Sequence, residues 1–202
     1  MSMFRRTRYT DGKRLTLLCL LMLPLIGCGL GELDDYAPLT VYDNFHAIEH
    51  GAAYRSAQLD STTMRLVLDE YDIRTVINLR GENPDRVWYV RERDAVNAAG
   101  ATLVDIAMSA HSLPPQENLL ALYDTFQAAE YPILIHCQAG ADRTGAAAAI
   151  WLMVMRGASR EDALWQLSPL FGHITAAAPE MDELAEMFEP SREWILEEYL
   201  RS

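Results

Sequence analysis

The feature that most constrains this chain is a strand, a ten-residue loop and a helix in direct succession. Residues 133–135 form a short apolar run of the kind found in a buried strand. The loop 136–145 follows it, and small residues from Ala146 onward suit a closely packed helix. This order places Cys137 and Arg143 six positions apart on one tight loop at a helix N-terminus.

The composition of this loop predicts a site that holds a phosphate and attacks it with a thiolate. Backbone N–H groups of such a loop cradle an anion, and the helix N-terminus adds partial positive charge. The same field favours the thiolate of Cys137, which is the nucleophilic form. Arg143 offers a planar fork for two phosphate oxygens. Gly140 permits close backbone approach, and Gly145 is expected to let the helix pack closely on the strand.

Two further residues are expected to support the cysteine. The hydroxyl of Thr144 can donate to the sulfur of Cys137, which stabilises it as nucleophile and as leaving group. His136 can fix the loop through hydrogen bonds. A lone cysteine at a strand end is often an inert core residue. Here the cysteine, both glycines, the arginine and the threonine all stand where one mechanism needs them, which favours catalysis.

The pattern His-Cys-x-x-Gly-x-x-Arg-Thr-Gly of residues 136–145 resembles the signature of the cysteine-dependent protein tyrosine and dual-specificity phosphatases. Segments 44–48, 54–58 and 76–80 fit the smaller bacterial members, so the resemblance covers roughly residues 44–170. It implies a phosphocysteine on Cys137, a phosphoryl group bound by Arg143, and no metal or organic cofactor. The implied phosphate-binding loop consists of Gln138, Ala139, Gly140, Ala141, Asp142 and Arg143.

The resemblance also requires a carboxylic acid that protonates the leaving oxygen, and three residues are candidates. Asp105 has the separation from the cysteine that many family members show, but it lies in a segment that alternates like a strand. The loop 109–115 contains no carboxylate, although it contains His111. Asp142 stands beside Arg143 on the phosphate loop, and some relatives use an Asp there as the acid. Asp142 is therefore the preferred general acid, with Asp105 and His111 as alternatives.

The first 27 residues resemble the signal peptide of a bacterial lipoprotein. A basic segment is followed by the apolar run 15–26, which is too short to span a membrane as a helix. Residues 25–28 fit a lipobox, which implies cleavage after Gly27 and a lipid on Cys28. An ordinary cleaved signal or an uncleaved anchor is the alternative. The signal implies an extracytoplasmic protein anchored by its lipid. Because residue 29 is Gly rather than Asp, we expect the periplasmic face of the outer membrane in an organism with two membranes.

Cysteine usage and charge fit this interpretation. The chain has three cysteines; Cys19 leaves with the signal and Cys28 carries the lipid, so no disulfide framework is expected. Beyond residue 27 the chain has 12 basic and 28 acidic side chains, a formal charge of −16. Such a surface repels nucleic acid, so no nucleic-acid partner is expected.

The coarse pattern predicts one α/β domain with a mostly parallel central sheet flanked by helices, of the protein tyrosine phosphatase type. The active loop then lies at the carboxyl edge of a central strand. We expect a signal peptide over 1–27, a tether over 28–43 and the phosphatase domain over 44–202. The expected strands are 53–55, 75–79, 101–106 and 133–136. The expected helices are 60–71, 83–100, 115–130, 145–156 and 159–167, with one or two more helices packed on the domain over 179–202.

The expected activity is hydrolysis of a phosphomonoester through a phosphocysteine, by a protein tyrosine phosphatase with dual specificity as an option. The expected partner is a phosphorylated protein or a small phosphomonoester, with the membrane reached through the lipid. Positions 138, 139 and 141 are Gln, Ala and Ala, which argues against a multiply charged substrate. A phosphoinositide or small-phosphomonoester phosphatase is the alternative, and an inactive phosphate-binding lipoprotein is the alternative of another class.

Overall fold

The computed structural model describes residues 43–199, which form an α/β domain around one five-stranded sheet. In chain order the strands are β1 (His46–Glu49), β2 (Ala53–Ser56), β3 (Thr75–Asn78), β4 (Thr102–Asp105) and β5 (Ile133–His136). The spatial order is β1-β2-β5-β3-β4. Only β1 is antiparallel to its neighbour. The predicted fold class is confirmed.

The strand register brings the carboxyl ends of the parallel strands to one edge. Ser56 pairs with His136, and His136 pairs with Asn78 on the other side. Asn78 in turn pairs with Asp105. Residues that follow β2, β3, β4 and β5 therefore meet at the same edge, where open parallel sheets bind ligands. Cys137 is the first residue beyond the central strand of that edge.

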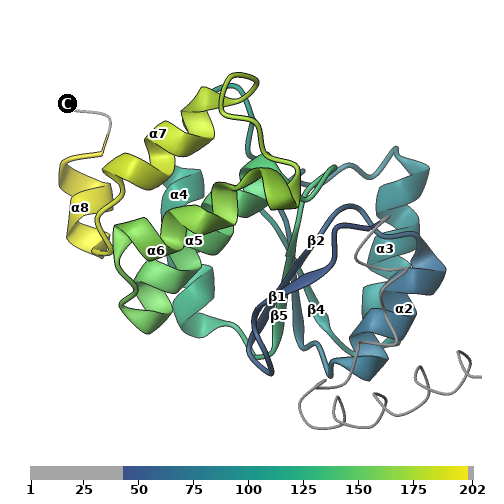
Figure 1. The fold of residues 1–202 in the computed structure, drawn as a ribbon. Helices are drawn as coiled ribbons and strands as arrows, with labels where there is room; N and C mark the ends of the chain where they lie inside the picture. The colour runs from purple at the N-terminus through teal and green to yellow at the C-terminus, as the bar shows by residue number, and fades with distance from the viewer. Residues whose placement is uncertain (1–42, 200–202) are drawn as a thin grey trace, which may run out of the picture. The chain divides into compact units, whose positions relative to one another are not determined.

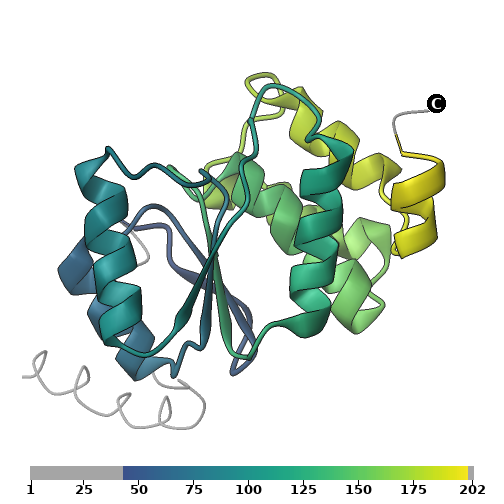
Figure 2. The same cartoon turned by 180° about the vertical axis from the view of Figure 1, so that it is seen from behind.

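Helices cover both faces of the sheet (Figures 1 and 2). One face carries α2 (Ser61–Glu70) and α3 (Val87–Ala98). The other carries α4 (Gln116–Ala128), α5 (Asp142–Arg156), α6 (Arg160–Leu164), α7 (Pro179–Met187) and α8 (Arg192–Glu197). Two short 3-10 turns, η1 (Trp165–Leu167) and η2 (Pro169–Phe171), connect α6 to the segment before α7.

Strand β5 shows how the sheet divides two cores. Ile133 and Ile135 belong to the core under α4 and α5, whereas Leu134 belongs to the core under α2 and α3. Successive side chains of a strand point to opposite faces, so a fully apolar strand has both faces covered. All four residues of β5 are buried, which explains why the sequence here is continuously apolar rather than alternating.

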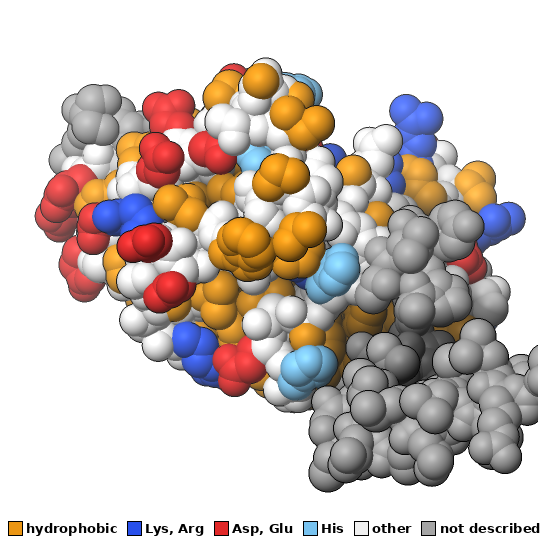
Figure 3. Space-filling model, viewed as in Figure 1, with side chains coloured by type: hydrophobic (Ala, Val, Ile, Leu, Met, Phe, Trp, Pro, Cys, Tyr) orange, Lys and Arg blue, Asp and Glu red, His pale blue; other side chains and the backbone are white. Residues whose placement is uncertain are grey.

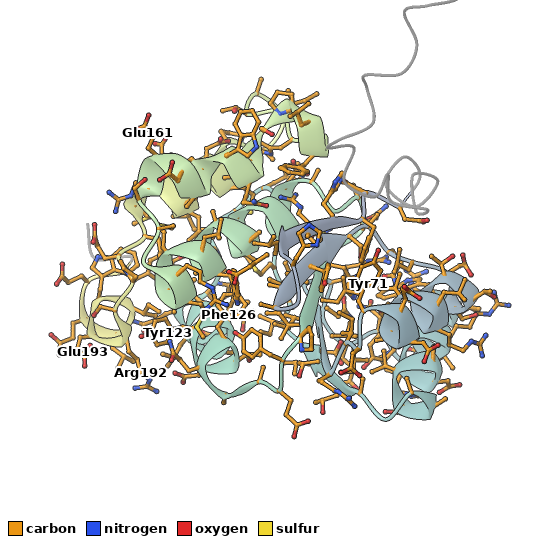
Figure 4. The ribbon with its side chains drawn as sticks, turned by 60° about the horizontal axis from the view of Figure 1, so that its bottom comes forward. Tyr71, Tyr123, Phe126, Glu161, Arg192 and Glu193 are labelled. Carbon is orange, nitrogen blue, oxygen red and sulfur yellow. The ribbon has the colours of Figure 1, made fainter. Side chains whose placement is uncertain are left out.

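The C-terminal helices pack on the domain, as the sequence indicates. Arg192 at the start of α8 donates from Nε to Asp124 Oδ1 at 2.9 Å and from Nη2 to Oδ2 at 3.1 Å, which ties α8 to α4. Figure 4 shows Arg192 close to Tyr123 at this end of the molecule, with Tyr71 on the opposite side of the sheet. The buried Tyr199 donates its hydroxyl to the carbonyl of Pro114.

Three local predictions are wrong. The helix expected from residue 83 begins at Val87, because the Asn83 side chain bonds the carbonyls of Arg80 and Gly81 and holds a turn there. The helix expected from Gly145 begins three residues earlier at Asp142. Strand β1 was not expected; it pairs antiparallel with β2 across a short turn at 50–52.

The predicted signal peptide, the lipid anchor at Cys28 and nearly all of the tether lie outside the described residues. The boundaries 1–27 and 28–43 therefore stay predictions from the sequence. Among residues 43–199, none of the helices has the length and apolar character needed to cross a bilayer.

Candidate active site

The phosphate loop is held from outside by its carbonyl groups. The carbonyl of Gln138 accepts from the amide of Gln58 at 3.1 Å, and that of Ala139 accepts from Asn44 Nδ2 at 3.0 Å. Arg55 Nη2 donates to the carbonyl of Gly140 at 2.7 Å and reaches the carbonyl of Ala141 at 3.4 Å. Four consecutive carbonyls are therefore directed away from the loop centre.

This arrangement turns the amide groups inward. In a trans peptide the C=O and the following N–H point in opposite directions, so outward carbonyls leave the N–H groups of residues 139–142 on the inner side. Within residues 43–199, these N–H groups of residues 139–142 donate no hydrogen bond. Helix α5 begins at Asp142, directly after them. The loop is thus a nest of free donors at a helix N-terminus, which is an anion site.

Arg55 is the main brace of this nest, and it is completely buried. Its Nη1 donates to the Gln166 backbone carbonyl at 2.8 Å and to Gln166 Oε1 at 2.7 Å. Its guanidinium carbon lies 4.1 Å from the centre of the Phe171 ring. Burial lowers the pKa of Arg55 to about 10, and the nearby Cys137 opposes this shift. Arg55 therefore braces the loop by binding carbonyl oxygens.

The two glycines of the motif have separate steric reasons. Gly140 has a φ of +69°, and a Cβ there would lie 2.6 Å from backbone atoms of Ser56 and Ala57. At Gly145 a Cβ would lie 2.7 Å from the Gln166 carbonyl oxygen and 2.8 Å from Leu167 Cδ2. The close contact of Gly145 is therefore with η1, and not with the strand as expected.

Cys137 is a free thiol at the bottom of the nest and is 2% exposed. Behind it, His136 Nε2 lies 2.7 Å from Glu92 Oε1, with both side chains buried. This close pair lies between the start of the loop and α3 without hydrogen-bond geometry at Nε2, and the supporting role of His136 stays a prediction. The expected bond from Thr144 to the sulfur is absent: Thr144 Oγ1 is buried without a hydrogen-bond partner among the described residues. Thr144 lies inside the first turn of α5, so helix geometry sets its direction.

Arg143 is oriented by two carbonyl groups from neighbouring loops. Its Nη1 donates to the carbonyls of Leu79 and Met108 at 3.4 Å and 3.3 Å. Its Nε is buried and has no partner within the described part of the chain. A guanidinium held by one nitrogen, with Nε left free, can offer the remaining edge of its fork to two phosphate oxygens.

A second arginine, Arg80, lies beside the nest. Its Nη1 donates to Gln58 Oε1 at 2.8 Å, and its guanidinium carbon stacks 3.4 Å from the centre of the Trp88 ring. Burial and then the nearby Arg143 lower the pKa of Arg80, while Glu92 and Cys137 oppose this. The site therefore collects positive charge in a domain whose overall charge is strongly negative.

The preferred general acid lies in the first turn of α5. The Asp142 side chain is 29% exposed, and its Oδ1 lies 2.8 Å from Nδ1 of the buried His173. His173 Nε2 lies 2.9 Å from Asp182 Oδ2 on α7. Sequence reasoning missed His173 and Asp182, because 31 and nine residues of chain separate the bonded partners. No local sequence pattern predicts such a contact.

The alternative acid Asp105 is fully engaged at the end of β4. Asn78 Nδ2 donates to Oδ1 at 2.7 Å, and the Tyr89 hydroxyl donates to Oδ2 at 2.5 Å. Burial and then this hydrogen bond raise the pKa of Tyr89, which keeps it a donor. A carboxylate that accepts on both oxygens has no proton to give. His111, the other alternative, is exposed on the loop after β4.

No metal site accompanies these groups in the described chain. Among residues 43–199, no set of three or more His, Cys, Asp or Glu side chains is arranged to hold a metal ion.

Comparisons with known proteins agree with this geometry. A family model described as "DSP-PTPase phosphatase fused to NAD+ Kinase" matches residues 40–180. A protein of Rattus norvegicus named "Phosphatidylglycerophosphatase and protein-tyrosine phosphatase 1" is 26% identical over 147 residues, which are 71% of this chain and 76% of the relative.

Two solved structures share the fold. TpbA of P. aeruginosa matches with a TM-score of 0.59 and 23% identity, over 73% of this chain and 86% of TpbA. The core catalytic domain of the PP-IP phosphatase Siw14 of S. cerevisiae matches with a TM-score of 0.58 and 22% identity, over 73% of this chain and 86% of that domain. TpbA has also been solved in complex with phosphotyrosine.

The packing at Gly140 gives a first test. Gly140→Ala should lower the free energy of unfolding by about 1–2 kcal/mol for the positive φ and by roughly 1–3 kcal/mol more for the backbone clash. Gly100→Ala is the matched control, because Gly100 has a φ of +73° and open space around its Cβ position. Urea unfolding measures both variants. Equal losses in the two variants would contradict the close approach of Gly140 to β2.

Proposed function

The chain belongs to the DSP-PTPase phosphatase family, and from this membership we propose that it hydrolyses phosphomonoesters through a phosphocysteine on Cys137. The match over residues 40–180 confirms the resemblance carried by the loop sequence. One observation carries the proposal for this chain: a buried thiol lies at the base of a nest of unbonded amides, with Arg143 at its rim.

In the first step the Cys137 thiolate attacks phosphorus. The S–P bond forms while the bond from phosphorus to the leaving oxygen breaks. The inward amides and Arg143 stabilise the charge on the non-bridging oxygens, which are the atoms that the site is built to hold. The leaving oxygen takes a proton from Asp142.

In the second step water attacks the phosphocysteine. The water gives its proton to the Asp142 carboxylate, the P–S bond breaks, and the thiolate of Cys137 returns as inorganic phosphate departs. The inward amides and the N-terminus of α5 stabilise the negative charge that returns to sulfur, which makes the sulfur of Cys137 a good leaving group. The cycle needs no cofactor beyond water.

The substrate that we propose is phosphotyrosine, with phosphoserine and phosphothreonine as secondary substrates. TpbA, which shares the fold, has been solved with phosphotyrosine bound. The side chains that this loop adds around the phosphate are Gln138, Ala139 and Ala141, which offer no charge for additional phosphates.

A phospholipid monoester is a second candidate. The rat relative carries phosphatidylglycerophosphatase in its name. In this chain η2 and the following loop lie beside the nest, because Asn44 Nδ2 bonds both the Ala139 and the Phe171 carbonyls. Leu170 and Ile174 there are 72% and 62% exposed, and Figure 3 shows hydrophobic side chains gathered on this face. Such a rim can accept an acyl chain.

Turnover of p-nitrophenyl phosphate by the wild type and by Cys137→Ser tests the proposal. The wild type should release p-nitrophenol, and the variant should lose this activity by at least about a thousandfold, because a neutral hydroxyl replaces the nucleophilic thiolate. Release that survives in Cys137→Ser would refute the phosphocysteine mechanism. No release by a folded wild type that binds vanadate would favour the inactive phosphate-binding protein.

The same pair of proteins identifies the substrate. Phosphotyrosyl and phosphoseryl peptides, phosphatidylglycerophosphate in detergent micelles and a phosphoinositide are compared by phosphate release. We expect the highest kcat/KM for the phosphotyrosyl peptide. Turnover of the lipid alone would replace the protein-phosphatase proposal with the second candidate and leave the chemistry unchanged.

The role of Asp142 is tested by two matched substitutions. With phenyl phosphate, whose leaving group needs a proton, Asp142→Asn should lower kcat by about 100-fold or more. Asp105→Asn should lower it much less, because Asp105 is occupied by Asn78 and Tyr89. Steady-state kinetics with both variants measures this difference. The reverse order of effects would assign the proton to Asp105.

We also propose that a lipid on Cys28 holds the enzyme at the outer membrane, on the periplasmic face. The support comes from the lipobox-like residues 25–28 and from Gly29, which stands where an inner-membrane retention signal would have Asp. A protein on that face would meet extracytoplasmic substrates.

The anchor is tested with the full chain expressed in a bacterium that has two membranes. The wild type should take up a labelled fatty acid and sediment with outer membranes, since two or more acyl chains anchor stably. Cys28→Ser should lose the label, and Cys19→Ser is the control that should keep it. Unlabelled wild type in the soluble fraction would refute the anchor.

A further inference from the structure

A buried histidine that has no part in the steps above is bonded to Asp142. His173 is 1% exposed and lies between η2 and α7. Its Nδ1 is 2.8 Å from Asp142 Oδ1, and its Nε2 is 2.9 Å from Asp182 Oδ2. Thr175 Oγ1 donates to the other oxygen of Asp182 at 3.2 Å. The chain Asp142–His173–Asp182 therefore links the first turn of α5 to the first turn of α7.

The two contacts of the His173 ring with carboxylate oxygens require hydrogen-bond donors. Each of the two contacts between a ring nitrogen and a carboxylate oxygen needs a proton. A neutral imidazole has only one N–H, so a second proton resides on the imidazole or on one carboxyl group. Without that proton a buried lone pair would face a carboxylate, which is costly. For Asp142 to act as the acid, a further proton sits on its Oδ2, so the three side chains are neutral before that proton is transferred and carry a net charge of −1 afterwards.

We propose that His173, held by Asp182, is the positioning residue that keeps Asp142 ready to protonate the leaving oxygen. This inference rests on the proposed function of Asp142. His173 fixes Oδ1, and Oδ2 makes no hydrogen bond within the described residues, so Oδ2 is the oxygen that can face a substrate.

The proton balance of the reaction includes the histidine. As the bond from phosphorus to the leaving oxygen breaks, Asp142 gives up one proton to that oxygen. The Nδ1–H of His173 then stabilises the carboxylate left behind, because a charge-assisted hydrogen bond is stronger than a neutral one. When water attacks the phosphocysteine, its proton returns to Asp142. Asp182 accepts from Nε2 throughout and keeps Nδ1 directed at Asp142.

The arrangement is not explained by metal binding, because both ring nitrogens of His173 are bonded within the chain. A purely structural brace between α5 and α7 is the competing explanation. The positioning role and the structural brace differ in how their loss depends on the leaving group of the substrate. A structural brace affects every substrate alike, whereas a residue acting through the general acid affects only substrates whose leaving group needs a proton.

The test compares p-nitrophenyl phosphate with phenyl phosphate. In His173→Gln, kcat for p-nitrophenyl phosphate should stay within about threefold of wild type, while kcat for phenyl phosphate falls about 10- to 100-fold. His173→Asn places an amide donor near the position of Nδ1 and should recover a large part of the phenyl phosphate activity. Asp182→Asn leaves the histidine in place and should show the same selectivity, so it carries the test if His173→Gln does not fold.

A double variant shows whether His173 acts through Asp142. Adding His173→Gln to Asp142→Asn should lower phenyl phosphate turnover no further, since residues that act as one unit are not additive. His46→Gln is the matched control. His46 Nε2 is 3.1 Å from Asn44 Oδ1, and its ring packs on Phe171, so this histidine supports the loop without contacting Asp142. Its loss should change both substrates by the same factor.

The outcomes separate this inference from the proposed function. Turnover of p-nitrophenyl phosphate that does not need Cys137 would refute the function itself. Two outcomes would overturn the role of His173 alone, provided that turnover needs Cys137. In the first, His173→Gln lowers the turnover of both substrates equally. In the second, its effect adds fully to that of Asp142→Asn. An Asp142→Asn variant that lowers turnover of both substrates by the same factor would overturn the role of His173 as well.

Discussion

The geometry of the site depends on the completely buried guanidinium of Arg55. Arg55 donates to the Gly140 carbonyl and to both oxygens of Gln166, and it stacks on Phe171. A buried cation is costly unless its donors are satisfied and negative charge lies near. Oxygens of Gly140 and Gln166 satisfy the two Nη groups, Nε has no partner among residues 43–199, and Cys137 supplies part of the nearby negative charge. The same bonds that stabilise Arg55 turn the loop's amides inward, so the anion site is a consequence of how one buried charge is accommodated.

The positions of the two motif glycines follow from the burial of Arg55. The nest needs Gly140 in a left-handed conformation, because its carbonyl must reach Arg55 while its Cα lies against the backbone of Ser56 and Ala57. Gly145 lets α5 approach η1, whose Gln166 completes the shell around Arg55. The positive region formed by Arg55, Arg80 and Arg143 attracts an anion into a domain whose surface otherwise repels one.

The sequence predicted the sheet and the loop because their signals are local. The apolar run before Cys137 and the Asp60 and Ser159 helix caps each lie within a few residues of the structure that they specify. Strand β1 escaped prediction because its four residues are only partly buried and carry no clear alternation. The carbonyl partners of Arg55 have no local signal, since they lie 85 and 111 residues away. Distant polar contacts leave no periodicity in a sequence.

In the proposed mechanism the acid is Asp142, which lies on the helix that carries Arg143. An acid on a separate loop can approach the leaving group when that loop moves, but Asp142 shares the first turn of α5 with Arg143 and has little freedom to adjust. Its direction must therefore be set from outside the helix, and the side-chain hydrogen bond that Asp142 makes among residues 43–199 is with His173. Meanwhile Asp105, at the end of β4, serves as an acceptor that joins Asn78 to Tyr89 and so secures the sheet edge. In the proposed mechanism, the position of Asp142 on α5 therefore couples proton donation to phosphate binding by rigid geometry, and the segment between η2 and α7 becomes part of the proposed site.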